Sequence, residues 1–244
     1  MTLSRARKHS SNLQIPWKQG AKILLFIFLV ILSIFSINKI KQTDEFPIHQ
    51  VKIYGAKHLN PKEIQRLLMP LVSKGFFAVE VDQVKEQLLQ APWIANASVT
   101  RIWPDQVLVT ITEHQPIARW NENNLLSSTG EIFTPDVNSY PAGLPHFIGP
   151  EGQQITMLEF YSKLNDIFHP LHLKITRLQL SPYLSWDVEF VNGMKMRLGY
   201  KDILTRVSHF VKVYSKIVGE RAGDVDYIDL RYPNGLAIRW KTVS

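Results

Sequence analysis

The clearest secondary-structure pattern in the chain is residues 186–198, WDVEFVNGMKMRL. Every second residue of 186–190 and of 194–198 is apolar, and a charged residue stands between each pair. This period of two is typical of strands with one buried face. Asn192-Gly193 is the preferred centre of a two-residue type I′ turn. We therefore predict a β-hairpin here, closed by a type I′ turn.

A helix and a second pair of strands follow the hairpin. Apolar residues between Ile203 and Ile217 recur at intervals of about one helical turn, and Gly219 is a typical C-terminal cap. Residues 228–232 alternate large apolar residues with Asp229 and Arg231, and residues 236–240 alternate them with Ala237 and Arg239. Pro233-Asn234-Gly235 between the two runs predicts a turn.

The sequence before the hairpin gives weaker signals of the same kind. Ser128-Thr129-Gly130-Glu131 separates two short apolar runs and predicts a turn between strands. Residues 135–152 contain four prolines and three glycines, so we expect a loop rather than a core element. The apolar residues from Met157 to Phe168 have helical spacing. Residues 114–244 are therefore predicted to form a β-rich domain with flanking helices.

Residues 46–113 show a different order of elements. Residues 48–54 alternate and stop at Gly55, which predicts a first strand. Residues 97–103 and 107–112 predict two more strands around a turn at Pro104-Asp105.

Two short helices are expected between the first and second of these strands. Asn60 is a typical N-cap with Pro61 at the first helical position, and Pro70 should end or kink this helix. The other helix should begin near Asp82, whose carboxylate would cap it, and end before Pro92. The predicted order is β-α-α-β-β.

This order, together with several short motifs, resembles a POTRA (polypeptide-transport-associated) domain of the kind found in the FtsQ/DivIB family of bacterial cell-division proteins. The motifs are Phe46-Pro47, Val51-x-Ile53-x-Gly55, Gly75-Phe76-Phe77, Pro92-Trp93-Ile94, Arg101-x-Trp103-Pro104 and Glu113-x-x-Pro116-x-Ala118. Taken singly they have structural explanations, such as core aromatic area for Trp93 and Trp103. Asp229-Leu230-Arg231-Tyr232-x-x-Gly235 and Trp240 extend the resemblance over the whole chain. The fold class is expected to be α+β.

The N-terminal region predicts a membrane anchor. Residues 23–38 carry no charge, and a helix over residues 23–40 would cover about 27 Å, near the hydrocarbon thickness. Five Lys and Arg precede this run and two follow it, which predicts a cytoplasmic tail (residues 1–22) and an exported C-terminal part. A cleaved signal peptide is the alternative, but the run lacks a small-x-small cleavage pattern. A buried helix of a soluble domain would need partners on every face.

The charge distribution argues against nucleic-acid binding. The net charge of +7 comes entirely from residues 1–41, and residues 42–244 carry 21 basic and 21 acidic side chains. Topology and anionic headgroups account for the basic tail. The chain has no cysteine, which excludes disulfides, thiolate metal sites and cysteine nucleophiles.

The sequence offers no constellation typical of catalysis. Its only Ser-x-x-Lys, Ser36 to Lys39, lies at the end of the apolar run, and His169 and His172 have no nearby carboxylate. The carboxylate pairs Asp187/Glu189 and Asp226/Asp229 are expected to be solvated charges on strand faces or in turns. We therefore expect no enzymatic activity, no cofactor, no metal and no small-molecule substrate.

Recognition is the remaining class of function. A strand near the chain end can leave main-chain groups unpaired and accept a partner strand. The candidate partner-binding residues are Arg231, Tyr232, Asn234, Gly235, Leu236 and Trp240. The competing interpretation is that Tyr232 and Trp240 point into the core while Arg231 is an exposed charge; the residues alone do not decide between the two.

The resemblance favours binding. It implies a non-enzymatic divisome scaffold of the bacterial inner membrane, concentrated at the septum, that holds the FtsB/FtsL coiled-coil pair through its C-terminal region. POTRA domains also occur in protein-transport and outer-membrane assembly factors, which is the alternative function. A membrane-anchored hydrolase is a third.

Overall fold

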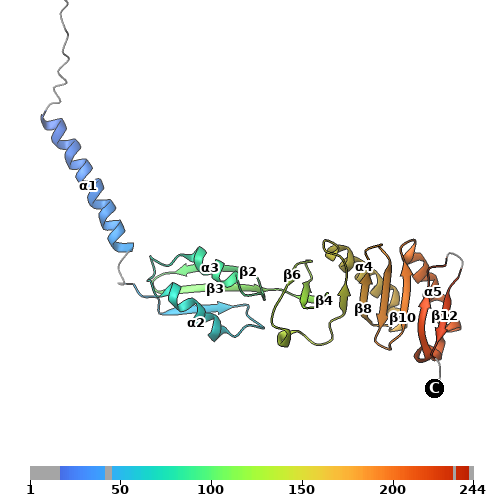
Figure 1. Cartoon of the computed structure of the whole chain (residues 1–244). Coiled ribbons are helices and arrows are strands. Elements are labelled where there is room, and N and C mark those ends of the chain that lie inside the picture. Colours follow the sequence, from blue (N-terminus) through green and yellow to red (C-terminus); the bar gives the residue numbers. More distant parts are fainter. Residues whose placement is uncertain (1–16, 42–45, 233–234, 242–244) are drawn as a thin grey trace, which may run out of the picture.

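The computed structural model describes residues 17–41, 46–232 and 235–241. Helix α1 (Trp17–Lys41) precedes a three-stranded sheet and a nine-stranded sheet, which lie one after the other along the molecule (Figure 1). The combination of helices with mixed sheets agrees with the α+β prediction.

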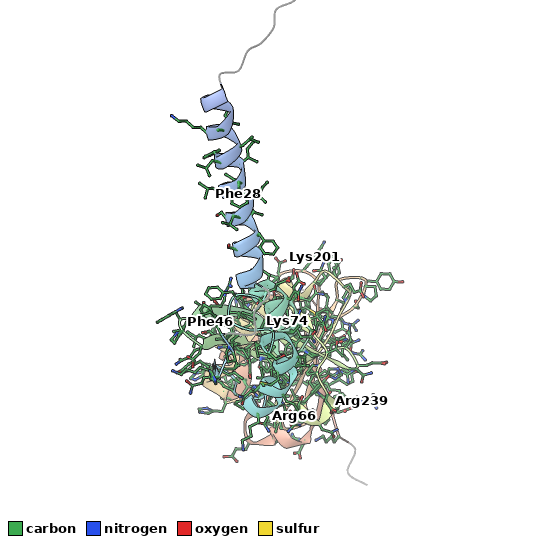
Figure 2. The ribbon with its side chains drawn as sticks, turned by 90° about the vertical axis from the view of Figure 1, so that its left-hand side faces the viewer. Phe28, Phe46, Arg66, Lys74, Lys201 and Arg239 are labelled. Atoms are coloured by element: carbon green, nitrogen blue, oxygen red, sulfur yellow. The ribbon has the colours of Figure 1, made fainter. Side chains whose placement is uncertain are left out.

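Helix α1 exposes its apolar side chains. The large hydrophobic residues from Ile23 to Phe35 are all well exposed, and Figure 2 shows side chains such as Phe28 projecting freely from the helix. Within the described part of the chain, no helix is both long enough and apolar enough to cross a membrane. The span over residues 23–40 therefore stays a prediction.

The first domain has the β-α-α-β-β order that the sequence predicts. Its elements are β1 (Gln50–Tyr54), α2 (Pro61–Val72), α3 (Val81–Leu89), β2 (Ile94–Ile102) and β3 (Gln106–Glu113). β3 lies in the middle of the sheet, parallel to β1 and antiparallel to β2. A parallel pair needs a crossover between its strands, and α2, α3 and β2 supply it.

The core of this domain lies between the sheet and its two helices. Alternate residues of β3, Val107, Val109 and Ile111, are buried against an apolar stripe of α2 and α3. The helical members of the cluster are Ile64, Leu68, Val72, Val84 and Leu88. The intervening residues of β3, Leu108, Thr110 and Thr112, lie on the other face of the sheet.

Two details of the first domain differ from the predictions. The N-cap of α3 is Glu80 and its side chain makes no capping bond, so Asp82 lies inside the first turn and is not the cap. Pro70 lies in the last turn of α2, which ends at Val72. Trp103 is 71% exposed and contributes nothing to the core, because it lies in the turn between β2 and β3. Asn60, in contrast, caps α2 as predicted, accepting a bond from the Lys62 amide.

The second domain is a nine-stranded mixed sheet with two helices. Its elements are β4 (Pro116–Trp120), β5 (Asn124–Ser127), β6 (Ile132–Phe133), η1 (Val137–Ser139), β7 (His146–Ile148), α4 (Gln154–Phe168), η2 (His169–Leu171), β8 (Ile175–Leu180), β9 (Trp186–Phe190), β10 (Lys195–Gly199), α5 (Ile203–Ile217), η3 (Gly219–Asp224), β11 (Val225–Asp229) and β12 (Ala237–Trp240). The strand order is β12-β11-β10-β9-β8-β7-β4-β5-β6. Helices α4 and α5 pack on this sheet through the main apolar cluster of the molecule.

Strand β7 corrects the prediction of a loop over residues 135–152. Although prolines and glycines surround it, β7 pairs in parallel with both β4 and β8 and lies inside the sheet. Phe147 is completely buried and contacts Tyr161 of α4 edge-on at 5.0 Å. Three residues are too short a strand to show a period in the sequence.

The hairpin at 186–198 is present, but its turn is not type I′. Gly193 has φ +79°, whereas Asn192 does not adopt a positive φ, which a type I′ turn requires at both centres. The Gly193 amide donates to the Phe190 carbonyl and the Phe190 amide donates to the Met194 carbonyl, both at 2.9 Å. These bonds enclose a loop with a type I turn followed by a left-handed glycine.

The two domains meet through a small apolar cluster of their own. Trp93 of the first domain packs with Leu125 and Phe133 of the second, and its indole N–H donates to Ser139 Oγ at 3.1 Å. The His58 ring stacks on Trp93 at 4.2 Å. The contact spans both domains and limits their independent movement.

Glu113, at the end of β3, ties the loop before α2 to this junction. Its carboxylate accepts from His58 Nδ1 at 2.7 Å and from the amides of Lys57 and His58. Although burial opposes it, hydrogen bonding from His58 and these amides holds the pKa of Glu113 below its ordinary value. The carboxylate therefore stays ionised where the domains join.

We expect Phe147→Ala to lower the free energy of unfolding by about 3–4 kcal/mol, because a fully buried ring leaves a cavity in the sheet interior. Chemical denaturation followed by circular dichroism measures this loss. Val137→Ala is the control, since Val137 is 62% exposed and its truncation should change stability by less than about 0.5 kcal/mol. Equal effects of the two changes would contradict the placement of β7.

Candidate partner-binding site at the C-terminal edge of the sheet

Strand β12 forms one edge of the nine-stranded sheet. It pairs antiparallel with β11, and among the described strands none pairs with its other side. The Lys241 amide donates to the Asp224 carbonyl at 2.7 Å, which shows that the main-chain groups of Lys241 point toward β11. Main-chain direction alternates along a strand, so those of Arg239 and Ala237 point the same way. The main-chain groups of Ile238 and Trp240 consequently point away from the sheet. They are unpaired donors and acceptors of the kind that accept an added strand.

A salt bridge shapes the segment that leaves β11. Asp229, with a side chain only 5% exposed, accepts two bonds from Arg231 Nε and one of 2.6 Å from Arg231 Nη2. Its Oδ1 also accepts from the Arg231 amide at 3.0 Å. The carboxylate thus fixes both the backbone and the guanidinium of Arg231, two residues away.

This arrangement corrects the prediction that Asp229 is a solvated charge. Hydrogen bonding from the Arg231 side chain lowers the pKa of Asp229, and burial only partly opposes this. Asp187, on β9 two strands away, is also partly buried, and burial raises its pKa although Arg197 and Arg231 lie nearby. Of the two carboxylate pairs predicted to be solvated, Asp226/Asp229 includes a largely buried member, Asp229, and Asp187/Glu189 includes a partly buried one, Asp187.

Arg206 on α5 reinforces the same segment from the helix side. Its Nη2 donates to the Leu198 carbonyl at 2.8 Å and its Nη1 reaches the Arg231 carbonyl at 3.5 Å. Its Nε is buried without a hydrogen-bond partner. Arg206 therefore joins the end of β10 to the chain that leads into β12.

Tyr232, Gly235 and Leu236 come together at a cavity of about 330 Å³ beside α5. The helix contributes Arg206, His209, Phe210 and Val213 to its lining, and the strand end contributes Leu230. Tyr232 is 54% exposed, so its ring stands at the rim and not in the core. Asn234 lies outside the described residues.

A larger cavity, of about 740 Å³, lies on the other side of Arg206. Its lining includes Lys201, Arg206, His209 and Arg231, with Asp202 as the acidic member. Cations outnumber carboxylates there, which favours an acidic group from a ligand. The side chain of Arg231 is 52% exposed, so Arg231 serves both this cavity and the salt bridge to Asp229.

Trp240 does not join the other predicted residues. It pairs opposite Val225 at the other end of β12, where its ring packs partly buried on the core and the Arg221 guanidinium lies 4.1 Å above it. The competing interpretation therefore applies to Trp240, whereas Tyr232 is available to a partner. Arg231 is neither a freely available partner-binding residue nor a simple exposed charge, because it is half-exposed and paired with Asp229.

Sequence reasoning missed Arg206 and His209. Both lie on α5, three residues apart, next to the buried positions Val207 and Phe210. A polar stripe beside an apolar stripe at this spacing is a detectable signal. The spacing does not show that this polar stripe faces the ends of β10 and β11.

Comparison with known proteins places the whole chain in one family. The model "Cell division protein FtsQ/DivIB, C-terminal" matches residues 118–231 and "POTRA domain, FtsQ-type" matches residues 46–114. Cell division protein FtsQ of Coxiella burnetii is 31% identical over 236 residues, covering 96% of this chain and 97% of that protein. FtsQ of Burkholderia pseudomallei is 33% identical over 225 residues, covering 90% of each, and that of Methylomonas methanica is 33% identical over 196 residues, covering 80% of this chain and 79% of its own length. β12 lies beyond the range that the C-terminal model matches.

We expect Asp229→Asn to lower the free energy of unfolding by about 1–3 kcal/mol at pH 7, because it removes the ionised partner of Arg231. The folded-state pKa of Asp229 is depressed, so its contribution exists above the unfolded pKa of about 3.9 and is lost as pH falls through the folded value. The difference between the variant and the parent should therefore shrink below about pH 4.

Asp226→Asn is the matched control on the same strand. Asp226 pairs with Arg239 at 3.4 Å, but both side chains are largely exposed, so the change should cost less than about 1 kcal/mol. Urea denaturation at pH 7 and pH 3 measures both variants. A pH-independent loss in Asp229→Asn would show that its charge is not what stabilises the segment.

Proposed function

We propose, starting from the fact that this chain belongs to the FtsQ family of cell division proteins, that it is a non-enzymatic scaffold of the division machinery. In this role it binds FtsB/FtsL through the C-terminal edge of its second domain. The observation that carries the proposal is the unpaired side of β12, which lies next to the cavity at Tyr232.

The recognition mechanism that we propose is strand addition to β12. The outward main-chain groups of Ile238 and Trp240 would pair with an extended segment of the partner, and these hydrogen bonds would supply affinity. The rim of the smaller cavity, with Tyr232 and Leu236, offers a place for an apolar side chain. The larger, cationic cavity offers one for an acidic side chain. Tyrosine and arginine are both enriched at interface hot spots.

We also propose that residues 23–40 anchor the chain in the inner membrane, with residues 1–22 in the cytoplasm and both domains in the periplasm. The sequence is uncharged from Ile23 to Asn38, and Lys39 lies near the end of the proposed span. Exposed apolar side chains from Ile23 to Phe35 and the excess of Lys and Arg before the run support this. Anchoring keeps the β12 edge within one molecular length of the membrane at the septum and raises its effective concentration toward partners held there.

The alternative function, a protein-transport or outer-membrane assembly factor, loses support because both matching family models describe FtsQ-type proteins. The absence of catalytic motifs from the sequence supports a scaffold over a hydrolase.

Tyr232→Ala should weaken binding of the detergent-solubilised chain to purified FtsB/FtsL by about tenfold, because it removes an exposed aromatic anchor beside the free edge. Tyr183→Ala is the matched control: Tyr183 is 89% exposed on the β8–β9 loop, and its removal should leave the affinity unchanged. Surface plasmon resonance measures both. An unchanged affinity in Tyr232→Ala would place the interface elsewhere.

Ile238→Pro tests strand addition itself. Proline removes an outward main-chain donor without removing a donor to β11, so binding should be lost by more than about tenfold while circular dichroism remains native-like. Arg231 is a poor test residue, since its replacement also leaves the Asp229 carboxylate unpaired. Retained binding by a folded Ile238→Pro chain would exclude strand addition at this edge.

A fluorescent fusion of the full chain should form a band at midcell in dividing cells, as a septal scaffold requires. An even distribution around the envelope would instead favour a role outside division. Fluorescence microscopy with a membrane dye in the same cells measures the enrichment.

A further inference from the structure

Three segments meet at the end of the first domain where the chain enters from α1. They are residues 46–49, 73–80 and 101–105. The Phe76 amide donates to the Phe46 carbonyl at 2.8 Å, and the His49 amide donates to the Asp105 carbonyl at 2.9 Å. Arg101 Nη1 reaches the Phe76 carbonyl at 3.4 Å. We call this surface the entry end; Figure 2 looks toward it and labels Phe46 and Lys74.

The entry end exposes large apolar side chains. Trp103 is 71% exposed, Phe46 42% and Phe77 41%, and Ile102 beside Trp103 is also exposed. The rings of Phe46 and Phe77 pack edge-on at 5.5 Å, so they contact each other and stay outside the buried core of the domain. A cluster of exposed aromatic rings on one surface indicates a binding surface.

The charges of the entry end are balanced. Lys74 and Arg101 are offset by Glu80 and Asp105, and His49 lies 3.2 Å from Asp105. A surface that bound nucleic acid or anionic lipid by charge would carry an excess of cations. Exposed Trp and Phe beside a few mixed charges are instead typical of the interfacial zone of a bilayer, where aromatic rings settle among the headgroups.

Chain connectivity brings this surface close to the proposed anchor. Five peptide steps join Lys41 at the end of α1 to Phe46, so their Cα atoms are at most about 18 Å apart. The headgroup layer on each side of a bilayer is about 5–8 Å thick. With α1 in the membrane, this connection is short enough for the entry end to rest against that layer.

We propose that Phe46, Phe77 and Trp103 insert into the headgroup region of the membrane that holds α1 and form a second point of contact. This inference rests on the proposed anchoring. The contact fixes the orientation of the first domain on the bilayer, because a single helix with a short connection leaves the domain free to rotate. The junction at Trp93 extends that orientation to the second domain.

The absence of cysteine from the chain allows a single label at any chosen position. We suggest the full chain in lipid nanodiscs, with Lys74→Cys carrying an NBD fluorophore at the entry end. Val191→Cys, in the exposed β9–β10 loop, is the aqueous control, and Phe28→Cys reports on α1. Lipids with a nitroxide on the headgroup should quench the label at 74 strongly and the label at 191 weakly.

The Phe28 label separates the two proposals. Quenching at position 28 by lipids with a nitroxide deep on the acyl chain, together with equal weak quenching at 74 and 191, would overturn the membrane contact and leave the anchor intact. A label at 28 that only a water-soluble quencher reaches would overturn the anchor and the contact together.

Trp103→Ser in the Lys74→Cys chain tests the residues themselves. Most of the headgroup quenching at 74 should be lost, because Trp103 is the most exposed of the three rings, while thermal unfolding should be unchanged. Tyr183→Ser in the same chain removes a still more exposed aromatic of the second domain and should preserve the quenching. Undiminished quenching in the Trp103→Ser chain would contradict the proposal that the aromatic rings make the membrane contact.

Discussion

The continuity of the nine-stranded sheet depends on β7, a strand of three residues. It alone joins the β4–β5–β6 strands beside the first domain to the β8–β12 strands that end at the free edge. Phe147 fills the interior at this join, and the amides of Arg119 and Asn121 donate to the carbonyls of Pro145 and Phe147. The His146 ring bonds to the Asn121 carbonyl, and burial lowers the pKa of His146, so the neutral ring suits this interior position. Without β7 the position of β12 would have no fixed relation to the first domain.

The far end of the sheet is held by charged groups and not by apolar packing alone. After β11 the chain must leave the sheet and return as β12, and its backbone there has few ladder partners. Asp229 holds the Arg231 amide and guanidinium, while Arg206 bonds to the carbonyls of Leu198 and Arg231. Removal of one partner from such a set leaves a buried group uncompensated. The charges therefore fix the chain at Arg231, where it leaves β11.

Periodicity predicts most of this architecture. The β-α-α-β-β order, the helices over 154–168 and 203–217 and the strands on either side of Asn192-Gly193 follow from spacing, because each buries one face of a regular element. β7 could not be predicted, since its three residues are too few to show a period. Trp103 was expected in the core from its size, but its exposure depends on the turn in which it lies.

The site was predicted less completely than the fold. Tyr232, Gly235 and Leu236 do come together, and only two residues separate Tyr232 from Gly235 in the sequence. Trp240 does not, since strand length carries it to the opposite end of β12. Arg206 and His209 reach the site from another element through tertiary packing, which the pattern of one element does not encode. Asp229 pairs with Arg231 two residues away, and the alternation of the strand does not show that Asp229 is buried.

The two proposed contact surfaces lie at opposite ends of the molecule, with the entry end of the first domain at one and β12 at the other (Figure 1). A flexible joint between them would let the edge strand move independently of the membrane contact. The junction opposes this, because Trp93, Phe133 and Leu125 form an apolar cluster, and His58 with Glu113 fixes the adjoining loop. Rotation of the first domain on the bilayer would thus also move β12, because the motion is transmitted along the whole length of the protein. A membrane contact of the first domain next to the anchor restricts this rotation. It would therefore keep the β12 edge pointing in a constant direction, as a scaffold requires.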